Sequence, residues 1–390
     1  MRNALKKVAI VGVYQTAQGR SLNRSRADLY TEAVKGVLDD AGMSIKEVDG
    51  LVGGNPLVTE GEGVGFPASG FGEFFGAHIR YSEQVQNGTQ GITLGMLHAM
   101  KAVALGYAHT VIAPTAAGRQ FGGSGPGRDS GQQVSGDEWF SPFGLARVAT
   151  YGMMARRHMY EYGTTPAQLA RVAVIARKHA VLNPGAAMHS RGPITVEDVL
   201  SSRMVYDPLH LLDCCIVNEG GGAVLITTAE RAKSLKHKPV HVLGFSESFD
   251  AVDLYHVPSV TSFGAKLTGK DAFAMAGVTN SDVNVAQISD HFTINAIIEL
   301  EDLGFCKPGE GGSMVESGAV ELGGKMPINT NGGYLSHSHT GDVGTFDIIE
   351  LVRQLRGEAG ARQVPKARVG LYHGVGGTFI SAQTAILARD

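Results

Sequence analysis

The chain alternates strand-like and helix-like segments, and this alternation constrains its fold more than any other feature. Val8–Val13 is an apolar run of strand length, and an amphipathic helical pattern follows from Leu29 to Ala41. Gly42 comes directly after that pattern, where a residue of left-handed conformation commonly ends a helix. Repeated alternation predicts an α/β fold with a largely parallel sheet and helices on its faces.

The next segments continue the same plan. Val48–Val52 again has the composition of a strand. Apolar residues at helical spacing run from Ile92 to Val103, and this predicted helix stops near Gly106. Val111–Ala113 is the strand that we expect to follow it.

The second half of the chain echoes the first. Ala276-Gly277 precedes Val283 by the same interval that separates Ala41 from Val48. A helical pattern from Ile348 to Leu355 ends before Gly357, and the strand-like run Val369–Tyr372 comes next. The echo predicts a duplicated core, although helix–glycine–strand sequences also recur in unrelated α/β proteins, so coincidence is the alternative. A duplication would place two equivalent strand-to-helix loops at one shared site, namely 86–91 and 331–344.

An elaboration separates the two halves at residues ~115–238. It begins with a Gly/Ser-rich loop at 118–136, continues with a helical pattern from Leu169, and closes with a capping box from Thr227 to Glu230. A long glycine-rich loop in a compact enzyme favours a lid or a binding loop. We therefore expect an N-terminal half at 1–238, which includes this insertion, and a C-terminal half at 239–390.

Composition and charge exclude several classes of function. The formal net charge is -3, which gives no support for nucleic-acid binding. No apolar stretch reaches the ~18 residues that a membrane span needs, and the start, Met1–Lys7, lacks the pattern of a signal peptide. The three cysteines have neither a disulfide framework nor paired zinc-binding spacing, which favours reduced thiols in a cytoplasmic protein.

Several unusual segments resemble the thiolase superfamily, and the resemblance spans nearly the whole chain. Within the superfamily the chain is most similar to sterol-carrier-protein-x-type thiolases and to their cysteine-less relatives, which include the steroid side-chain retro-aldolases. The segments that carry the resemblance are 41–52, 208–215, 219–223, 290–293, 300–306, 309–311 and 329–339.

The resemblance implies a thiolase fold with two duplicated βαβαβ-containing halves and a large helical and loop insertion. It also implies lipid metabolism on a coenzyme A thioester substrate, no tightly bound cofactor, and a homodimer. Aldolase relatives work with a small zinc-ribbon/OB-fold partner subunit, which is the further partner that we expect. Neither a metal ion nor nucleic acid or a membrane belongs to this expectation.

The thiolase nucleophile is missing from its expected place. Thr89 falls about where a thiolase has its nucleophilic cysteine, ahead of the predicted helix, although Gly88 is the alternative equivalent. Threonine lacks the acidity of a thiol, so a capping or turn role is the simpler interpretation, with its backbone N–H available to an oxyanion. Cys214 and Cys215 match a buried core segment of the family and should be inert.

His339 matches the histidine of the thiolase GHP motif, with Ser338 in place of its glycine and Thr340 in place of its proline. In the family this histidine activates the nucleophile or polarises the thioester carbonyl, and imidazole chemistry suits either task. A retro-aldolase relative has a tyrosine at this position. The alternative is a hydrogen-bonded loop histidine, and His337 is expected to be solvent-facing or structural.

Ser289 corresponds to the Asn, His or Tyr that opens the NEAF, HDCF or YDHF motif of the family, where that residue holds an oxyanion or works as an acid or base. Serine is shorter and can only form a hydrogen bond, directly or through water. His291 could replace the lost function if the strand end turns, and packing is its alternative role.

His373 lies near the place of the second thiolase cysteine, which moves a proton on the α-carbon, and histidine can do this at neutral pH. Five glycines are expected to let the backbone approach the pantetheine or thioester: Gly332, Gly333, Gly374, Gly376 and Gly377.

The resemblance leaves three functions open. The first is an aldolase or retro-aldolase of a β-hydroxyacyl-CoA, which needs no acyl-enzyme and therefore tolerates the loss of the cysteine. The second is an acyl-CoA acyltransferase of the thiolase type, similar to acetyl-CoA acetyltransferases. The third is a thiolase-like subunit that binds a CoA thioester without turnover. The acyl group and any assembly beyond a dimer do not follow from the sequence.

Overall fold

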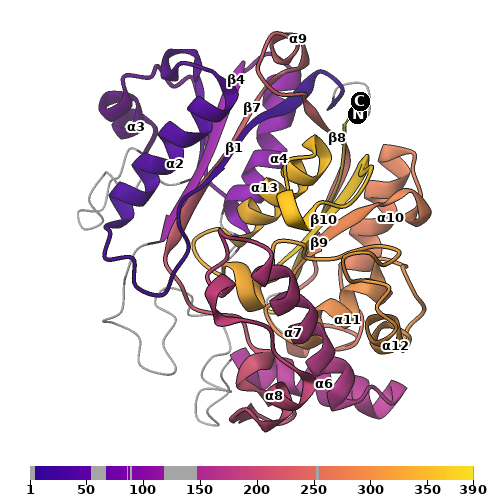
Figure 1. Ribbon diagram of the computed structural model, residues 1–390. Helices are drawn as coiled ribbons and strands as arrows, with labels where there is room; N and C mark the ends of the chain where they lie inside the picture. Colours follow the sequence, from indigo (N-terminus) through magenta and orange to yellow (C-terminus); the bar gives the residue numbers. More distant parts are fainter. Residues whose placement is uncertain are drawn as a thin grey trace.

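The computed structural model describes residues 5–53, 67–85, 87, 90–117, 147–251 and 254–389. Within them, nine strands form one mixed sheet in the order β3-β2-β4-β7-β1-β8-β11-β10-β9, which runs through the centre of the molecule (Figure 1). The strands of this sheet are β1 (Val8–Gln15), β2 (Gly50–Val52), β3 (Tyr81–Glu83), β4 (Thr110–Ala117), β7 (Gly220–Thr228), β8 (Val240–Phe249), β9 (Val285–Ile288), β10 (Val369–Gly376) and β11 (Ser381–Arg389).

The strand order repeats in the two halves of the chain. From the centre outward, the first half runs β1-β7-β4-β2-β3 and the second half runs β8-β11-β10-β9. In each half the first strand of this sheet in the sequence is central, the last strand lies beside it, and the strand before the last comes next. Even the fifth position has a counterpart, because Ile328 forms an isolated parallel bridge with Ala286 of β9. The halves meet where β1 and β8 pair, at Ile10 and Val240. The repeated order supports duplication over coincidence.

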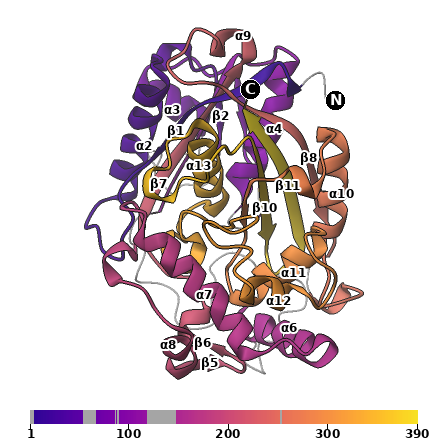
Figure 2. The ribbon, with the colours of Figure 1, turned by 45° about the vertical axis from the view of Figure 1, so that its right-hand side comes forward.

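Two helices lie between the halves and others cover the outer faces. In Figures 1 and 2, α4 (Gly91–Ala104) and α13 (Val343–Arg356) occupy the centre, and their apolar side chains share one core cluster with strands of both halves. One outer side carries α2 (Arg26–Ala41) and α3 (Pro67–Phe75). The opposite side carries α10 (Ala265–Ala276), α11 (Thr293–Asp302) and α12 (Gly311–Glu316).

The helix pattern of the sequence is confirmed where it was strongest. Leu29 and Ala41, the ends of the first pattern, are fully buried on α2. Gly42 follows in the left-handed conformation with φ 68°, and Gly277 ends the corresponding helix α10 with φ 69°. Both glycines end a helix before a single 3-10 turn, at Ile45–Glu47 and at Asn280–Asp282. This local repeat is the structural basis of the echo in the sequence.

The insertion between β4 and β7 forms a helical layer at one end of the molecule (Figure 1). Its elements are α6 (Arg147–Tyr162), α7 (Pro166–Val181), α8 (Val196–Ser201) and the small hairpin of β5 (Met204–Tyr206) and β6 (Leu209–His210). Helix α7 packs against α8, α11 and α12, and it also contacts the turn at Gly333–His337. The insertion therefore reaches the loop in which the sequence analysis placed its main histidine.

Two expectations from the sequence are wrong. The sheet is not largely parallel, because β7 and β11 each run antiparallel to both of their neighbours. The turn from Gly376 to Ser381 is too short for a crossover, so β11 must return beside β10 in the opposite direction. The predicted capping box is also displaced, since Thr228, not Thr227, caps α9 (Ala229–Ala232) and accepts a hydrogen bond from the Arg231 N–H.

Among the described residues, no helix combines the length and the apolar character that crossing a bilayer requires. The glycine-rich loop at 118–136 lies outside the described residues.

The left-handed helix end at Gly42 gives a direct test of this fold. Since no atom lies within 4 Å of a Cβ built there, a substitution meets only backbone strain. We expect Gly42→Ala to lower the free energy of unfolding by about 1 kcal/mol, and Gly42→Asn to cost less because asparagine tolerates this conformation. Urea unfolding of the three proteins measures the difference. Equal costs for the two variants would contradict the assignment.

Candidate active site

The loop that joins Asn329 to the start of α13 forms an unusual turn. Gly332 and Gly333 have φ values of 112° and 59°, and the next residues form η7 (Gly333–His337), a single π-helical turn. A Cβ on Gly333 would overlap the Asp290 carboxylate, and one on Gly332 would lie 2.6 Å from the Cβ of Ala180. Glycine is required at both positions by left-handed backbone and by close packing, and π-helical turns of this kind are frequent at functional sites.

Two histidines face each other beside this turn. His291 follows Ser289 and Asp290 at the end of β9, and its ring lies 5.2 Å, centroid to centroid, from that of His339 in an edge-to-face arrangement. The Tyr334 ring packs 4.8 Å from His291 and 6.0 Å from His339. Both imidazoles are partly exposed, whereas residues 329–338 are all buried. The pair therefore forms the accessible part of an otherwise closed polar region.

Each of these imidazoles has a ring nitrogen free for chemistry. The Nδ1 atom of His291 and the Nε2 atom of His339 have no hydrogen-bond partner within the described structure. Burial lowers the pKa of His339 to about 4 and that of His291 well below its ordinary value, and the positive charge of Arg147 lowers both further. At neutral pH both rings are uncharged, so each can accept or donate one proton.

A buried hydrogen-bond network supports the Tyr334 side of the pair. The Tyr334 hydroxyl donates to the Asp347 carboxyl on α13 at 2.5 Å and accepts from the Gln90 amide at 3.1 Å. The Tyr372 hydroxyl of β10 donates to the Gln90 Oε1 atom and accepts from Gln383. Burial raises the pKa of Asp347 far above its ordinary value. Because Gln90 comes directly before α4, this network connects the two strand-to-helix loops that the duplication places together.

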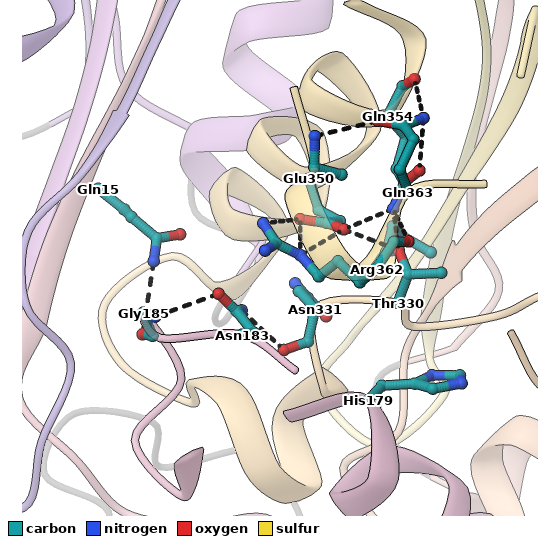
Figure 3. A network of polar contacts seen from close by, with 12 residues as sticks. Gln15, His179, Asn183, Gly185, Thr330, Asn331, Glu350, Gln354, Arg362 and Gln363 are labelled. Atoms are coloured by element: carbon teal, nitrogen blue, oxygen red, sulfur yellow. Dashed lines mark hydrogen bonds and ion pairs between the residues drawn. The ribbon is translucent and has the colours of Figure 1, made fainter. Parts of the chain in front are cut away.

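The beginning of the loop is held from two sides (Figure 3). Helix α7 and the residues that follow it lie on one side, where the Asn183 amide donates to the Asn331 carbonyl and His179 Nδ1 donates to the Asn329 carbonyl. On the other side, the Thr330 hydroxyl donates to Glu350 of α13 at 2.8 Å. The loop therefore has little freedom at its start.

Glu350 is itself held by a buried ion pair. The Arg362 guanidinium donates to both of its carboxylate oxygens at 2.9–3.1 Å, and Gln354 donates to its Oε1 atom (Figure 3). Both partners of the pair are almost fully buried. The loop is thus fixed to a charged centre that is shielded from water.

The end of the loop depends on a residue that the sequence analysis did not identify. Asn218, just before β7, accepts a hydrogen bond from the His339 N–H at 2.7 Å and donates to the Ser338 hydroxyl. Asp290, Tyr334, Asp347 and Gln90 were missed as well. Tyr334 and Asp347 lie 13 positions apart and converge only through the turn, so their spacing gave no sign of contact.

The structure brings some of the predicted residues together and separates others. Ser289, His291 and His339 surround the same turn, and the Ser289 hydroxyl accepts a hydrogen bond from the Val375 N–H at 3.1 Å. His373 is fully buried and bonds to Thr384, on the opposite side of β10 from Tyr372. Its predicted role in proton transfer stays a prediction.

Other predicted positions have different outcomes. Thr89 and its alternative Gly88 lie outside the described residues. His337 is buried rather than solvent-facing, with a pKa lowered to about 3 by burial. Gly374 and Gly376 pack against protein groups, the Tyr372 hydroxyl and the Asn87 amide, and Gly377 has a left-handed φ of 62°. Their contact with a thioester stays a prediction.

The cysteines are closer to the site than their sequence positions suggest. The Cys215 N–H donates to the His291 carbonyl at 2.8 Å, and Cys214 forms an isolated antiparallel bridge with Phe292. Burial is the main cause that raises the pKa of Cys214, Cys215 and Cys306 to about 12. All three are free thiols and remain protonated at neutral pH, as the sequence analysis expected of inert cysteines.

Comparison with known proteins agrees with this architecture. Residues 246–389 match the family model described as thiolase C-terminal domain-like. An acetyl-CoA acetyltransferase of Methanothermobacter thermautotrophicus is 36% identical over 99% of this chain and 100% of the relative. The 17-hydroxy-3-oxo-4-pregnene-20-carboxyl-CoA lyase of Mycobacterium tuberculosis is 37% identical over 90% of this chain and 92% of the relative. The solved structure of an Ltp2-ChsH2(DUF35) aldolase superposes with a TM-score of 0.88 and 33% identity, covering 99% of this chain and 98% of that chain.

The buried imidazoles predict sensitivity to acid. Burial lowers the pKa of His179 to about 4, and its two nitrogens bond the Asn329 carbonyl and the Leu322 N–H as a neutral ring. Because the folded pKa lies below the unfolded value, the unfolded chain takes up the proton first and stability is lost as the pH falls from about 6.5 towards 4. We expect His179 alone to remove about 1 kcal/mol between pH 7.5 and 5.5.

Urea unfolding at the two pH values measures this loss. In His179→Asn the pH-dependent part should shrink, although the variant is less stable at both pH values. The exposed His78 provides the control, since His78→Asn should leave the pH dependence as in the unmodified protein. An equal pH dependence in His179→Asn and the unmodified protein would show that His179 is not the source.

Proposed function

Because this chain belongs to the thiolase superfamily, we propose that it is a thiolase-like enzyme that cleaves a carbon–carbon bond of a β-hydroxyacyl-CoA thioester by a retro-aldol reaction. The observation that carries the proposal is the pair of uncharged imidazoles, His291 and His339, each with a free ring nitrogen beside the turn at Gly333–His337. An aldol cleavage requires a base and a polarising donor, and it requires no covalent intermediate on the enzyme.

The reaction divides naturally between the two rings. His339 has the less strongly lowered pKa and is the base that takes the proton of the β-hydroxyl group. As the carbonyl forms at the β-carbon, the bond between the α- and β-carbons breaks and its electron pair moves into the thioester enolate. His291, held neutral by burial, donates a hydrogen bond to the enolate oxygen. The α-carbon then takes back a proton, which leaves an aldehyde or ketone and a shortened acyl-CoA.

The electrostatic surroundings favour a neutral pair in the free enzyme and a negative charge during the reaction. Burial, and after it the Arg147 charge, keep His291 and His339 neutral in the free enzyme. The imidazolium that His339 becomes when it takes the proton is offset by the negative charge of the enolate that forms in the same step. The site is therefore suited to form an anion on the substrate.

A direct test replaces the base. We expect His339→Gln to lower kcat by about 10²- to 10⁴-fold on a β-hydroxyacyl-CoA substrate, with a smaller effect on KM, because general base catalysis contributes that much. The measurement follows the aldehyde or ketone and the shortened acyl-CoA by mass spectrometry across a panel of β-hydroxyacyl-CoA and acyl-CoA thioesters. His109→Gln is the control, since this imidazole is 64% exposed and bonds to Asp49. Unchanged turnover in His339→Gln would refute the assignment.

Acyl transfer is the second candidate, and one observation favours it. The acetyl-CoA acetyltransferase of Methanothermobacter thermautotrophicus matches this chain over its whole length. A thiol also lies near the site, because the Cys215 N–H donates to the His291 carbonyl. A protonated thiol with a pKa of about 12 is nevertheless a poor nucleophile. The aldolase assignment therefore fits the site better. A CoA thioester bound without turnover is the outcome that would leave only the subunit role.

Cys215→Ser separates the two reactions. Under the lyase proposal the variant should keep kcat within about twofold, because no acyl-enzyme forms and the thiol stays protonated. Incubation with acyl-CoA should leave the protein mass unchanged, and labelled CoA should not exchange into the substrate. A covalent acyl adduct that disappears in Cys215→Ser would establish acyl transfer instead.

A partner subunit belongs to the proposal as well. The name of the solved aldolase pairs Ltp2 with ChsH2(DUF35), and the superposition with that structure covers 99% of this chain. By this similarity, the chain is proposed to form a homodimer that also binds a small zinc-ribbon/OB-fold subunit. Native mass spectrometry of the purified complex is the measurement, and a homodimer with full lyase activity alone would count against the additional subunit.

A further inference from the structure

Asp290 is a fully buried carboxyl group that lies against the turn at Gly333–His337. It directly precedes His291 in the chain, so its backbone and that of His291 move together. Its side chain contacts a different segment, the turn that leads to His339: the Oδ1 atom accepts a hydrogen bond from the Tyr334 N–H at 2.6 Å. Asp290 is therefore linked to His291 as its neighbour in the chain, and to the turn that leads to His339 by its hydrogen bond with Tyr334.

The backbone of the turn is shaped to receive this carboxyl group. The consecutive left-handed residues Gly332 and Gly333 direct the N–H groups of the turn towards Asp290. The Leu335 N–H and the Asn329 side chain are further donors to the same group. No side chain larger than hydrogen fits at Gly333, because its Cβ would overlap the Asp290 Oδ2 atom. The first N–H groups of a helical turn have no partner within it, and a carboxyl group satisfies them.

The turn leads directly to His339 and positions it together with Asn218, which accepts from the His339 N–H. The Ser338 N–H donates to the Gly333 carbonyl and closes the π-helical turn, and His339 is the next residue. Tyr334, whose N–H bonds Asp290, also places its ring against both imidazoles. We therefore expect a substitution of Asp290 to change the distance between the His291 and His339 rings, while both rings stay chemically unchanged.

We propose that Asp290 is a positioning residue that sets the distance and the edge-to-face orientation of His291 and His339 by anchoring the turn Gly333–His337. The catalytic part of this inference rests on the proposed function, whereas the positioning part concerns geometry alone.

Asp290→Ala tests the anchor with two independent measurements. The first measurement is the NMR chemical shifts of the His291 and His339 ring protons, assigned with the variants His291→Gln and His339→Gln. Neighbouring aromatic rings shift these signals in the unmodified protein. In Asp290→Ala the chemical shifts should move towards those of a solvent-exposed histidine. On a β-hydroxyacyl-CoA substrate, kcat should fall by about 10²-fold with KM changed far less, because a displacement of about 1 Å in a catalytic group has this effect. Asp290→Asn retains an oxygen that can accept from Tyr334 and should restore most of both properties.

Asp302→Ala is the matched control. This partly buried carboxyl group on α11 also accepts from one backbone N–H, that of Phe263, and from one hydroxyl, that of Ser262, and burial raises its pKa to about 6. Its substitution should lower stability without moving the histidine signals or kcat. If Asp290→Ala does not fold, Gly333→Ala displaces the same carboxyl group from the other side and should give the same signature.

The outcomes separate this inference from the proposed function. If Asp290→Ala folds and its histidine signals and kcat equal those of the unmodified protein, the positioning role is overturned. Asp290 would then have a purely structural role. Signals that move in a protein without any lyase turnover would support the positioning role while the retro-aldol proposal fails. Equal effects of Asp302→Ala and Asp290→Ala on the signals would also overturn the inference, because the effect would then be one of general stability.

Discussion

The Arg362 guanidinium and the Glu350 carboxylate form a buried ion pair inside the molecule, and the loop that carries His339 begins beside this pair, at Thr330. Removing two charges from water costs several kcal/mol for each ion, which only good geometry and additional hydrogen bonds offset. Gln354 and Thr330 provide those bonds. A shift of Thr330 would break its hydrogen bond to a buried carboxylate, so the start of the loop that carries His339 is held in place.

The same burial that makes the loop rigid determines the protonation of the site. Burial lowers the pKa of His291 and His339 and raises the pKa of Asp347 and Tyr334, because it disfavours the charged form of each group. The result is a group of titratable side chains that are all neutral at pH 7: Tyr334 and Asp347 share a hydrogen bond, and the Tyr334 ring packs against both imidazoles. Burial is the main cause of the lowered pKa of both imidazoles, and the Arg147 charge lowers both further. Such a site can move a proton and stabilise an anion on the substrate at little cost in reorganisation.

The sequence predicted the repeated helix–glycine–strand units well because each depends on local rules: the apolar period of α2 and the left-handed glycine after it are visible in the chain. The strand directions were wrong because β7 and β11 return antiparallel, which depends on connection geometry rather than on residue type. His291 and His339 were identified individually. Their contact was not, because it arises from the π-helical turn and from Asp290, whose role depends on which backbone N–H groups it meets.

A thiolase-like fold without an activated thiol can still perform carbon–carbon chemistry, provided that the acid–base groups are retained. Acyl transfer requires a thiolate, and here the nearest thiol, Cys215, is kept protonated by burial. Aldol cleavage requires a base, a donor to the enolate oxygen and exclusion of water. The imidazole pair and the turn at Gly333–His337 meet these requirements without a covalent step. Under the proposed function, the loss of the nucleophile changes which bond the site breaks, while the enolate is still the species that it stabilises.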